Sequence, residues 1–125
     1  MKKPTRKSAK AKAVKYFNKF IVLRDGKRCV QCGSTENVGC GHVIAKGQGE
    51  ALLFDEDDCH AQCWAHNYKH SHFPEDYTGW FLEAYGTDLY REIVRRKKEI
   101  KKYTIDDFLE IADKYKAKCE ALEAR

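Results

Sequence analysis

The sequence predicts a small α+β fold, and three features of the chain point to this class. Apolar residues recur at three- and four-residue steps near the N-terminus and through the last third, which is typical of helices. Between them lies a Gly-rich, turn-prone stretch with short candidate strands. This stretch also carries two pairs of metal-binding residue types, CVQC and CWAH, separated by 30 residues. A single domain of 125 residues stabilised by a bound metal ion accounts for all three features.

The N-terminal segment is strongly basic. Residues 1–28 contain eleven Lys/Arg against one acid, whereas residues 29–125 contain 13 against 18. We expect residues 1–12 to form a disordered basic arm and residues 13–125 to form one domain. A basic arm on a mildly acidic body favours DNA as a partner, with a solvated tail as an equal alternative. The candidate DNA contacts are Lys10, Lys12, Lys15, Lys19, Arg95 and Arg96.

The first helix is expected over about residues 9–25. Val14, Phe17 and Ile21 form an apolar row, and Gly26 follows as a stop signal. Lysines occupy the opposite face of this helix, so one side can pack while the other meets phosphate.

Two strands are expected in the middle of the chain, at residues 38–45 and 51–54. The link between them, residues 46–50, contains two glycines and suits a hairpin. The four acids that follow are typical of a helix N-terminus. We therefore expect a helix over about residues 58–71 that ends near Pro74 and carries the CWAH pair one turn apart.

The last third predicts three helices. The first should cover residues 76–85 and end before Gly86, and the second should cover residues 88–102. Thr104 should cap a final helix, whose apolar stripe favours packing within the chain and leaves a homodimer through a partner helix open. The stripe consists of Ile105, Phe108, Leu109, Ala112, Tyr115, Cys119 and Leu122.

The two spaced pairs predict a structural zinc site. Thiolate and imidazole ligands bind zinc tetrahedrally, and both pairs have the i,i+3 spacing of such sites. The ligands would be Cys29, Cys32, Cys63 and His66. Cys40 is an alternative ligand, whereas Cys119 fits a packed core position.

The cysteines favour metal binding over oxidation. The N-terminus lacks a signal-peptide pattern and the chain lacks an apolar membrane span, so we expect a cytoplasmic protein with no membrane partner. A thioredoxin-like redox role for the CVQC pair is a weak rival, because the surrounding βαβ pattern is missing.

His42 and Asn67 suggest phosphodiester chemistry. A neutral imidazole can accept a proton from water near pH 7, and an amide oxygen suits a catalytic Mg²⁺ or Mn²⁺ ion. On its own, His42 would more often be a hydrogen-bonded structural histidine. The order of the surrounding motifs changes that expectation.

The sequence resembles the HNH, or ββα-metal, nuclease motif, and more closely the NinG/Rap recombination proteins of lambdoid phages. The matching stretches span about residues 14–122 and include KYFNKFIVLRDGKRCVQCG, GHVIA, LLFDEDDCHAQC and the following HN. The resemblance implies a zinc-bound ββα core over residues 29–73 with a helical extension over 76–125. It also implies a structure-selective endonuclease that cuts branched recombination DNA such as Holliday junctions, D-loops or flaps, with no small-molecule substrate.

The resemblance assigns roles to four residues. His42 would be the general base and Asn67 a ligand of the catalytic ion. Asp58 stands at the middle position of the motif, usually asparagine, and would brace the hairpin; His60 would assist as a second ligand or phosphate contact. Gly41 replaces the acid that many such sites carry before the first histidine. Two other functions therefore stay open: a branched-DNA-binding accessory protein without cleavage, and an adaptor that uses its last helix.

Overall fold

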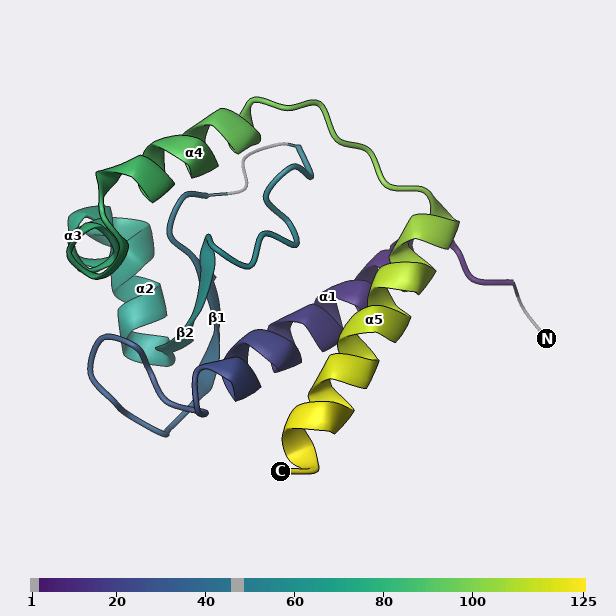
Figure 1. Ribbon diagram of the computed structural model, residues 1–125, viewed down its shortest axis with the longest axis horizontal. Coiled ribbons are helices and arrows are strands. Elements are labelled where there is room, and N and C mark those ends of the chain that lie inside the picture. The colour runs from purple at the N-terminus through teal and green to yellow at the C-terminus, as the bar shows by residue number, and fades with distance from the viewer. Residues whose placement is uncertain (1–2, 46–48) are drawn as a thin grey trace.

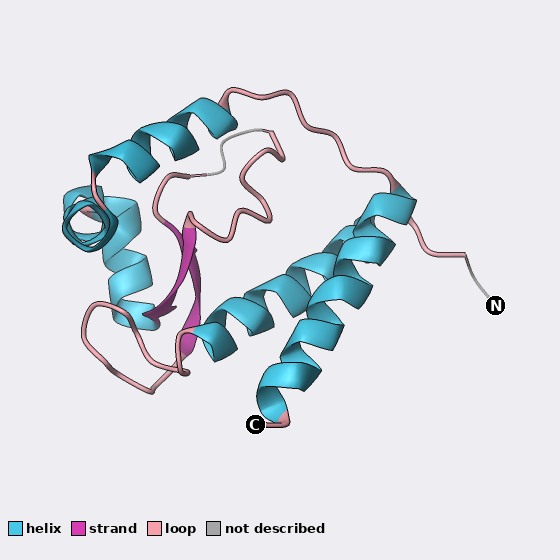
Figure 2. Ribbon diagram, viewed as in Figure 1, coloured by secondary structure: helices cyan, strands magenta, loops and turns pink. Residues whose placement is uncertain are grey.

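The computed structural model describes residues 3–45 and 49–125, and these residues form a mixed α+β fold (Figures 1 and 2). Two strands lie between a pair of long helices on one side and three shorter helices on the other. The elements are, in order, α1 (Arg6–Arg24), β1 (Val38–His42), β2 (Cys59–Cys63), α2 (Trp64–His72), α3 (Pro74–Tyr85), α4 (Thr87–Lys97) and α5 (Ile105–Glu123).

Helices α1 and α5 pack side by side and run in the same direction (Figure 1). Arg6 reaches the Tyr103 carbonyl at one end of the pair, and Lys19 pairs with Glu123 at the other. The expected stripe of α5 is therefore used within the chain. The buried residues of this interface and the strand beneath it are Phe17, Phe20, Ile21, Cys59, Tyr115 and Cys119.

Helix α1 begins earlier than expected, so the prediction of a disordered arm over residues 1–12 is wrong from Arg6 onward. Thr5 caps the helix in a capping box with Ser8, and Ala9 is buried against α5. Arg6 and Lys10 both pair with Glu50. Capping and tertiary contacts thus order a segment whose composition alone predicted disorder.

The second strand is not where the sequence placed it. The stretch 51–54 forms turns, and β2 (Cys59–Cys63) pairs antiparallel with β1, with His42 opposite Cys59 and Val38 opposite Cys63. All five residues of β2 are buried, because helices cover both faces of the strand. The expected hairpin link at 46–50 falls partly outside the described residues.

Helix α2 is correspondingly shorter than expected and begins at Trp64. The acids at 55–58 signalled a helix, but burial and pairing with β1 take the following residues into the sheet. Such non-local pairing overrides local propensity.

Helices α3 and α4 dock onto the loops around the sheet through a second apolar cluster. Helix α2 ends at His72, near Pro74 as expected, and Pro74 itself begins α3, two residues before the expected start. Helix α4 ends at Lys97 rather than at residue 102. Tyr77 and Phe81 are core residues. The cluster comprises Val43, Leu52, Tyr77, Phe81 and Ile93.

Arg24 and Asp25 fasten the end of α1 to β2. The Arg24 guanidinium donates to the Glu56 and Cys59 carbonyls, and the Asp25 carboxylate accepts from the Ala61 N–H at 2.8 Å. This ties the long helix pair to the sheet.

The last helix follows its sequence signal closely. Thr104 caps α5 in a capping box with Asp107, as expected.

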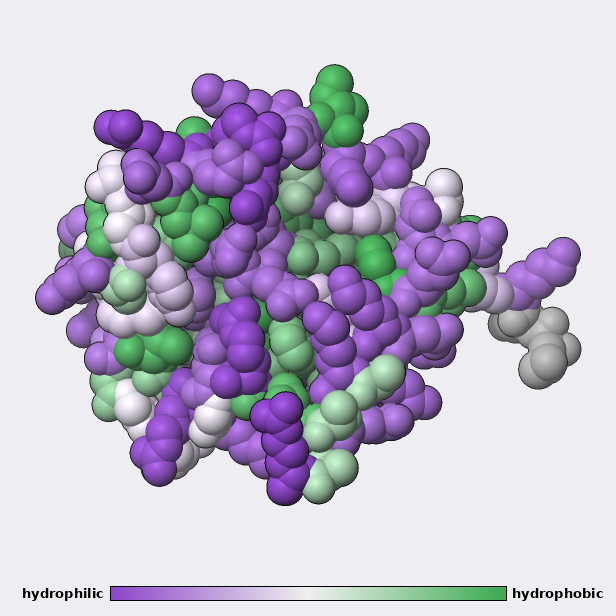
Figure 3. Space-filling model, in the orientation of Figure 1, coloured by the Kyte–Doolittle hydropathy of each residue, from purple (hydrophilic) through white to green (hydrophobic). Residues whose placement is uncertain are grey.

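The surface is predominantly polar. Hydrophilic residues cover most of the face shown in Figure 3. Among the described residues, no helix combines the length and apolarity needed to span a membrane.

Candidate functional site

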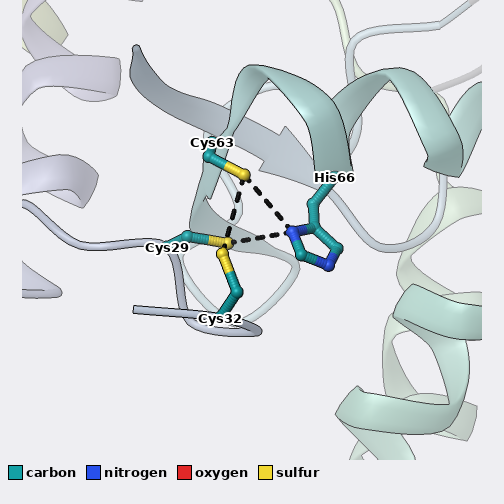
Figure 4. Close-up of side chains that lie close together, drawn as sticks. All are labelled: Cys29, Cys32, Cys63 and His66. Atoms are coloured by element: carbon teal, nitrogen blue, oxygen red, sulfur yellow. Dashed lines mark hydrogen bonds between the residues drawn. The ribbon is translucent and has the colours of Figure 1, made fainter. Parts of the chain in front are cut away.

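The four residues expected to bind zinc lie together. Their ligand atoms are all within 4.8 Å of one another, and Figure 4 shows the side chains pointing toward a common centre. The Cys32 and Cys63 sulfurs are 3.8 Å apart, and the His66 Nδ1 atom lies 3.3 Å from the Cys63 sulfur and 3.7 Å from that of Cys29. A tetrahedral zinc site has edges of about 3.8 Å between sulfurs and about 3.5 Å between sulfur and nitrogen. The donor set therefore fits a structural zinc ion.

A tight turn presents the first ligand pair. Gly33 has a positive φ of 77°, and its N–H donates to the Cys29 carbonyl at 2.8 Å. The Val30 N–H donates to the Ala61 carbonyl, which holds the turn against β2. Cys63 ends that strand and His66 lies in the first turn of α2, so one strand-to-helix junction supplies the second pair.

The environment of Cys29 favours its thiolate. Burial opposes ionisation, but backbone N–H groups of Cys63, Gln31 and Cys32 directed at the sulfur outweigh it and lower the Cys29 pKa. The other three cysteines lie elsewhere: Cys59 and Cys119 are buried in the apolar cluster around Phe17, and Cys40 packs against it.

His42 ends β1 and is held in a defined orientation. Its Nε2 atom lies 3.0 Å from the Leu52 carbonyl oxygen. A carbonyl only accepts, so a neutral His42 carries its proton on Nε2, and Nδ1 is the basic nitrogen.

Asn67 lies on α2 and faces the residue that precedes His42. A Cβ atom added to Gly41 would lie 3.2 Å from the Asn67 Oδ1 atom. Helix α2 and strand β1 thus bring the Asn67 amide beside the glycine next to His42. The Tyr77 hydroxyl donates to the Gly41 carbonyl at 2.8 Å, which fixes the strand at this point.

Asp58 is fully buried at the base of the hairpin. Its Oδ1 atom accepts from the Ile44 N–H at 2.8 Å, and its Oδ2 atom has no partner among the described residues. Burial, assisted by the charge of Asp55, raises the Asp58 pKa to about 7 despite the Ile44 hydrogen bond. The contact joins the two sides of the hairpin.

His60 occupies a structural position rather than the site, which corrects the role expected for it. Its side chain is buried, its Nε2 atom donates to the Asp57 carbonyl at 2.9 Å, and its Nδ1 atom faces the Arg24 guanidinium at 3.3 Å. Burial lowers the His60 pKa. With both ring nitrogens engaged and the ring packed on Trp80 and Tyr85, it is not available to metal or phosphate.

Most of the predicted DNA-contacting cations are paired within the chain. Lys10 pairs with Glu50 and Lys19 with Glu123. Arg95 pairs with Glu92 and Glu99 along α4, whereas Arg96 bonds to Asp55 and Asp57 in the loop before β2. Lys12 and Lys15 are exposed and make no ion pair within the described ranges.

Sequence reasoning missed three residues on or beside α2. Trp64 and Tyr68 are 66% and 54% exposed and stack with ring centroids 5.3 Å apart. Gln62 is buried, with its side chain directed at Gly41. Gly41 within the strand was a signal that another group approaches closely, whereas nothing lies within 4 Å of a Cβ atom built on Gly39.

Comparison with known proteins gives a family match. No curated protein and no solved structure matches the chain. The family model described as "Bacteriophage Lambda NinG protein" matches residues 1–125. This match over the whole length shows that the chain belongs to the phage lambda NinG family.

Proposed function

We propose that this protein is a metal-dependent endonuclease that hydrolyses phosphodiesters in branched recombination DNA. Membership of the NinG family suggests a role related to phage recombination. The observation that carries the proposal is the position of Asn67, whose amide oxygen lies beside Gly41, the residue that precedes His42. The His42 ring itself is oriented by the Leu52 carbonyl.

His42 is the general base of this proposal. Its Nε2–H is engaged by the Leu52 carbonyl, so Nδ1 takes a proton from the attacking water, and the same carbonyl stabilises the imidazolium that results. The contact also limits rotation of the ring. General-base catalysis of this kind contributes roughly 10²–10⁴-fold in rate.

Asn67 is the proposed ligand of a divalent ion. Its Oδ1 atom lies beside the backbone of Gly41, close to the position that a side chain at residue 41 would occupy. Carbonyl-type oxygens suit Mg²⁺ and Mn²⁺. When bound, such an ion neutralises charge on the phosphate and the leaving oxygen.

The zinc cluster has a different part in the proposal. Its four ligands come from the turn before β1 and from the junction of β2 with α2. Zinc bound there would hold α2, and hence Asn67, against the hairpin.

An exposed aromatic pair supports branched or unpaired DNA as the substrate. Trp64 lies three residues before Asn67 on α2, and Tyr68 directly follows Asn67. Exposed stacked rings offer a surface on which unpaired bases can stack, and such contacts contribute about 1–3 kcal/mol per base. Bases lose their pairing partners at junctions and flaps, which would place this pair beside the cleavage site.

The test is a cleavage assay with the zinc-loaded full chain. End-labelled junction, flap and linear duplex DNA are incubated with Mg²⁺ or Mn²⁺. We expect wild type to cut the branched substrates, and His42→Gln, which still donates to the Leu52 carbonyl, to lose at least about 10²-fold in rate. Zinc content and melting temperature report on folding. Equal cutting by both proteins would remove His42 from the mechanism.

Trp64→Ala separates substrate recognition from chemistry. It should weaken binding of branched DNA more than binding of linear duplex, with Lys116→Ala, an exposed change on the distant α5, as the control. Equal weakening on both substrates would argue against base stacking.

One observation favours a second function, a branched-DNA-binding accessory protein without cleavage. Gly41 supplies no carboxylate beside His42, and a divalent ion usually has at least one such ligand. Binding of branched DNA with no cutting in either metal would select this alternative.

A further inference from the structure

We propose that Gln62 provides a second protein ligand for the divalent ion through its side-chain oxygen, next to Asn67. This rests on the proposed function, because it assigns a further residue to the same site. It also explains how a site with glycine before its histidine can hold an ion.

The Gln62 side chain is buried and fixed in one orientation. Only 1% of the residue is exposed, and its Nε2 atom donates to the Gln31 Oε1 atom at 2.8 Å. The Oε1 atom must therefore point the other way. It is buried and has no hydrogen-bond partner among the described residues. Leaving such an oxygen unpaired costs about 1–3 kcal/mol, so its retention calls for a function.

That oxygen points at Gly41. A Cβ atom built on Gly41 would lie 2.0 Å from Gln62 Oε1 and 3.2 Å from Asn67 Oδ1. Two amide oxygens, one from β2 and one from α2, thus lie within 3.2 Å of a single point beside the residue that precedes His42. Mg²⁺ and Mn²⁺ take oxygen ligands at about 2.1 Å, so modest side-chain adjustment brings both onto one ion.

The geometry explains why position 41 is glycine. A side chain there would force the Gln62 amide to move from its bond to Gln31, because real Cβ atoms do not approach an oxygen to 2.0 Å. Gln62 therefore takes the room that a carboxylate at position 41 would need, and supplies an oxygen donor in its place.

Replacing a carboxylate by an amide has a consequence for affinity. Two neutral ligands leave the charge of the ion uncompensated, so the ion should bind weakly to the free protein and more tightly with a DNA phosphate present. A carboxylate at position 62 should reverse this. Gln31 can turn its amide to donate to a glutamate there, which makes Gln62→Glu sterically conservative.

The experiment is a Mn²⁺ titration of zinc-loaded, ¹⁵N-labelled full chain, followed by paramagnetic broadening of side-chain amide signals. We expect the Gln62 and Asn67 signals to broaden first in the wild type. Gln62→Ala should weaken Mn²⁺ binding at least about tenfold, and Gln62→Glu should strengthen it by roughly tenfold. Gln31→Ala is the matched control, which removes the orienting partner and should change affinity less than about threefold.

A double variant separates metal binding from packing. Gly41→Asp alone should disturb the hairpin, whereas Gly41→Asp with Gln62→Ala makes room for the carboxylate and should recover Mn²⁺ binding. Broadening that spares Gln62, or wild-type affinity in Gln62→Ala, would overturn the assignment. Cleavage that persists alongside that result would leave the nuclease proposal standing. Broadening at Gln62 without DNA cleavage would support the ligand assignment and reject the nuclease.

Discussion

The α1–α5 pair and the segment from Cys29 to α2 keep their shapes by different means. The helix pair buries large side chains such as Phe17 and Tyr115, whose rings meet edge to face at 5.0 Å. The second segment also buries apolar side chains, but Val43, Leu52 and Leu53 pack against helices outside it. It converges on four metal-type ligands and two short strands.

The two regions should therefore respond differently to a single change. Apolar burial is spread over many contacts, so one change removes a fraction of it. A four-ligand metal site loses most of its contribution when one ligand or the ion is removed. The proposed active site lies in the segment from Cys29 to α2, so its geometry should depend on bound zinc.

Removal of zinc should have the largest effect. Chelation, or Cys63→Ser, should unfold the turn before β1, the hairpin and α2, because structural zinc sites contribute on the order of 10 kcal/mol. Helices α1 and α5 should keep more of their protection in hydrogen exchange. Cys119→Ala, a thiol outside the cluster, is the control that should retain zinc. Unchanged protection in α2 after chelation would show that the cluster is not a structural metal site.

Phe17→Ala should produce the largest loss within the helix pair. Phe17 is fully buried and contacts Phe54 and Tyr115, so truncation should cost about 3–5 kcal/mol in the free energy of unfolding. Urea denaturation measures the loss, and Phe17→Leu should cost about 1 kcal/mol. The folded variant should still bind one zinc ion. Loss of zinc at full folding would mean that the two regions are more tightly coupled than proposed.

Asp58 should make stability depend on pH. In the unfolded chain a carboxyl group ionises near pH 4. In the folded protein, burial and, to a smaller extent, the charge of Asp55 raise the Asp58 pKa to about 7. Between these values the folded state binds more protons, so this group lowers stability as pH rises from about 4 to 7.

Asp58→Asn removes that dependence and keeps an acceptor for the Ile44 N–H. Its stability advantage over wild type should grow to about 4 kcal/mol at pH 8, as measured by urea denaturation from pH 5 to 8. Comparing the two proteins at each pH cancels the effect of acid on zinc. A difference that does not vary with pH would contradict the expected ionisation of Asp58.

Arg96 and Arg95 should show the smallest effects and differ from each other. Arg96 is 29% exposed and joins α4 to Asp55, whose side chain is 8% exposed. Arg96→Ala should cost about 1 kcal/mol in the free energy of unfolding. Arg95 is 60% exposed and pairs with Glu92 on its own helix and Glu99 just beyond the end of that helix, so Arg95→Ala should leave stability unchanged. Equal losses would show that the link to the loop before β2 is unimportant.

Local signals predicted part of this structure well. Thr104 and its capping box mark the start of α5, and the repeated apolar spacing marks the face of α5 that meets α1. The Cys29–Cys32 and Cys63–His66 spacing identified the ligand set, because two ligand residues three positions apart can both reach the same zinc ion.

The second strand could not be found in the same way. Residues 59–63 follow four acids and precede a helix, so local propensity favoured helix, and only pairing with β1 between two layers of helices made them a strand. The exclusion of His60 from the site likewise depends on contacts with Arg24 and Asp57, 36 and three residues away in the sequence.

By itself, then, the sequence determined the α+β class, most of the helices, the Cys3His ligand set and the residues His42 and Asn67 as candidates, since each depends on short-range spacing and side-chain chemistry. The tertiary structure alone decided the position of β2, the internal pairing of Lys10 and Arg96, and the approach of Gln62 and Asn67 to Gly41. These features arise from contacts between segments distant in the chain, whose register and burial no local pattern encodes.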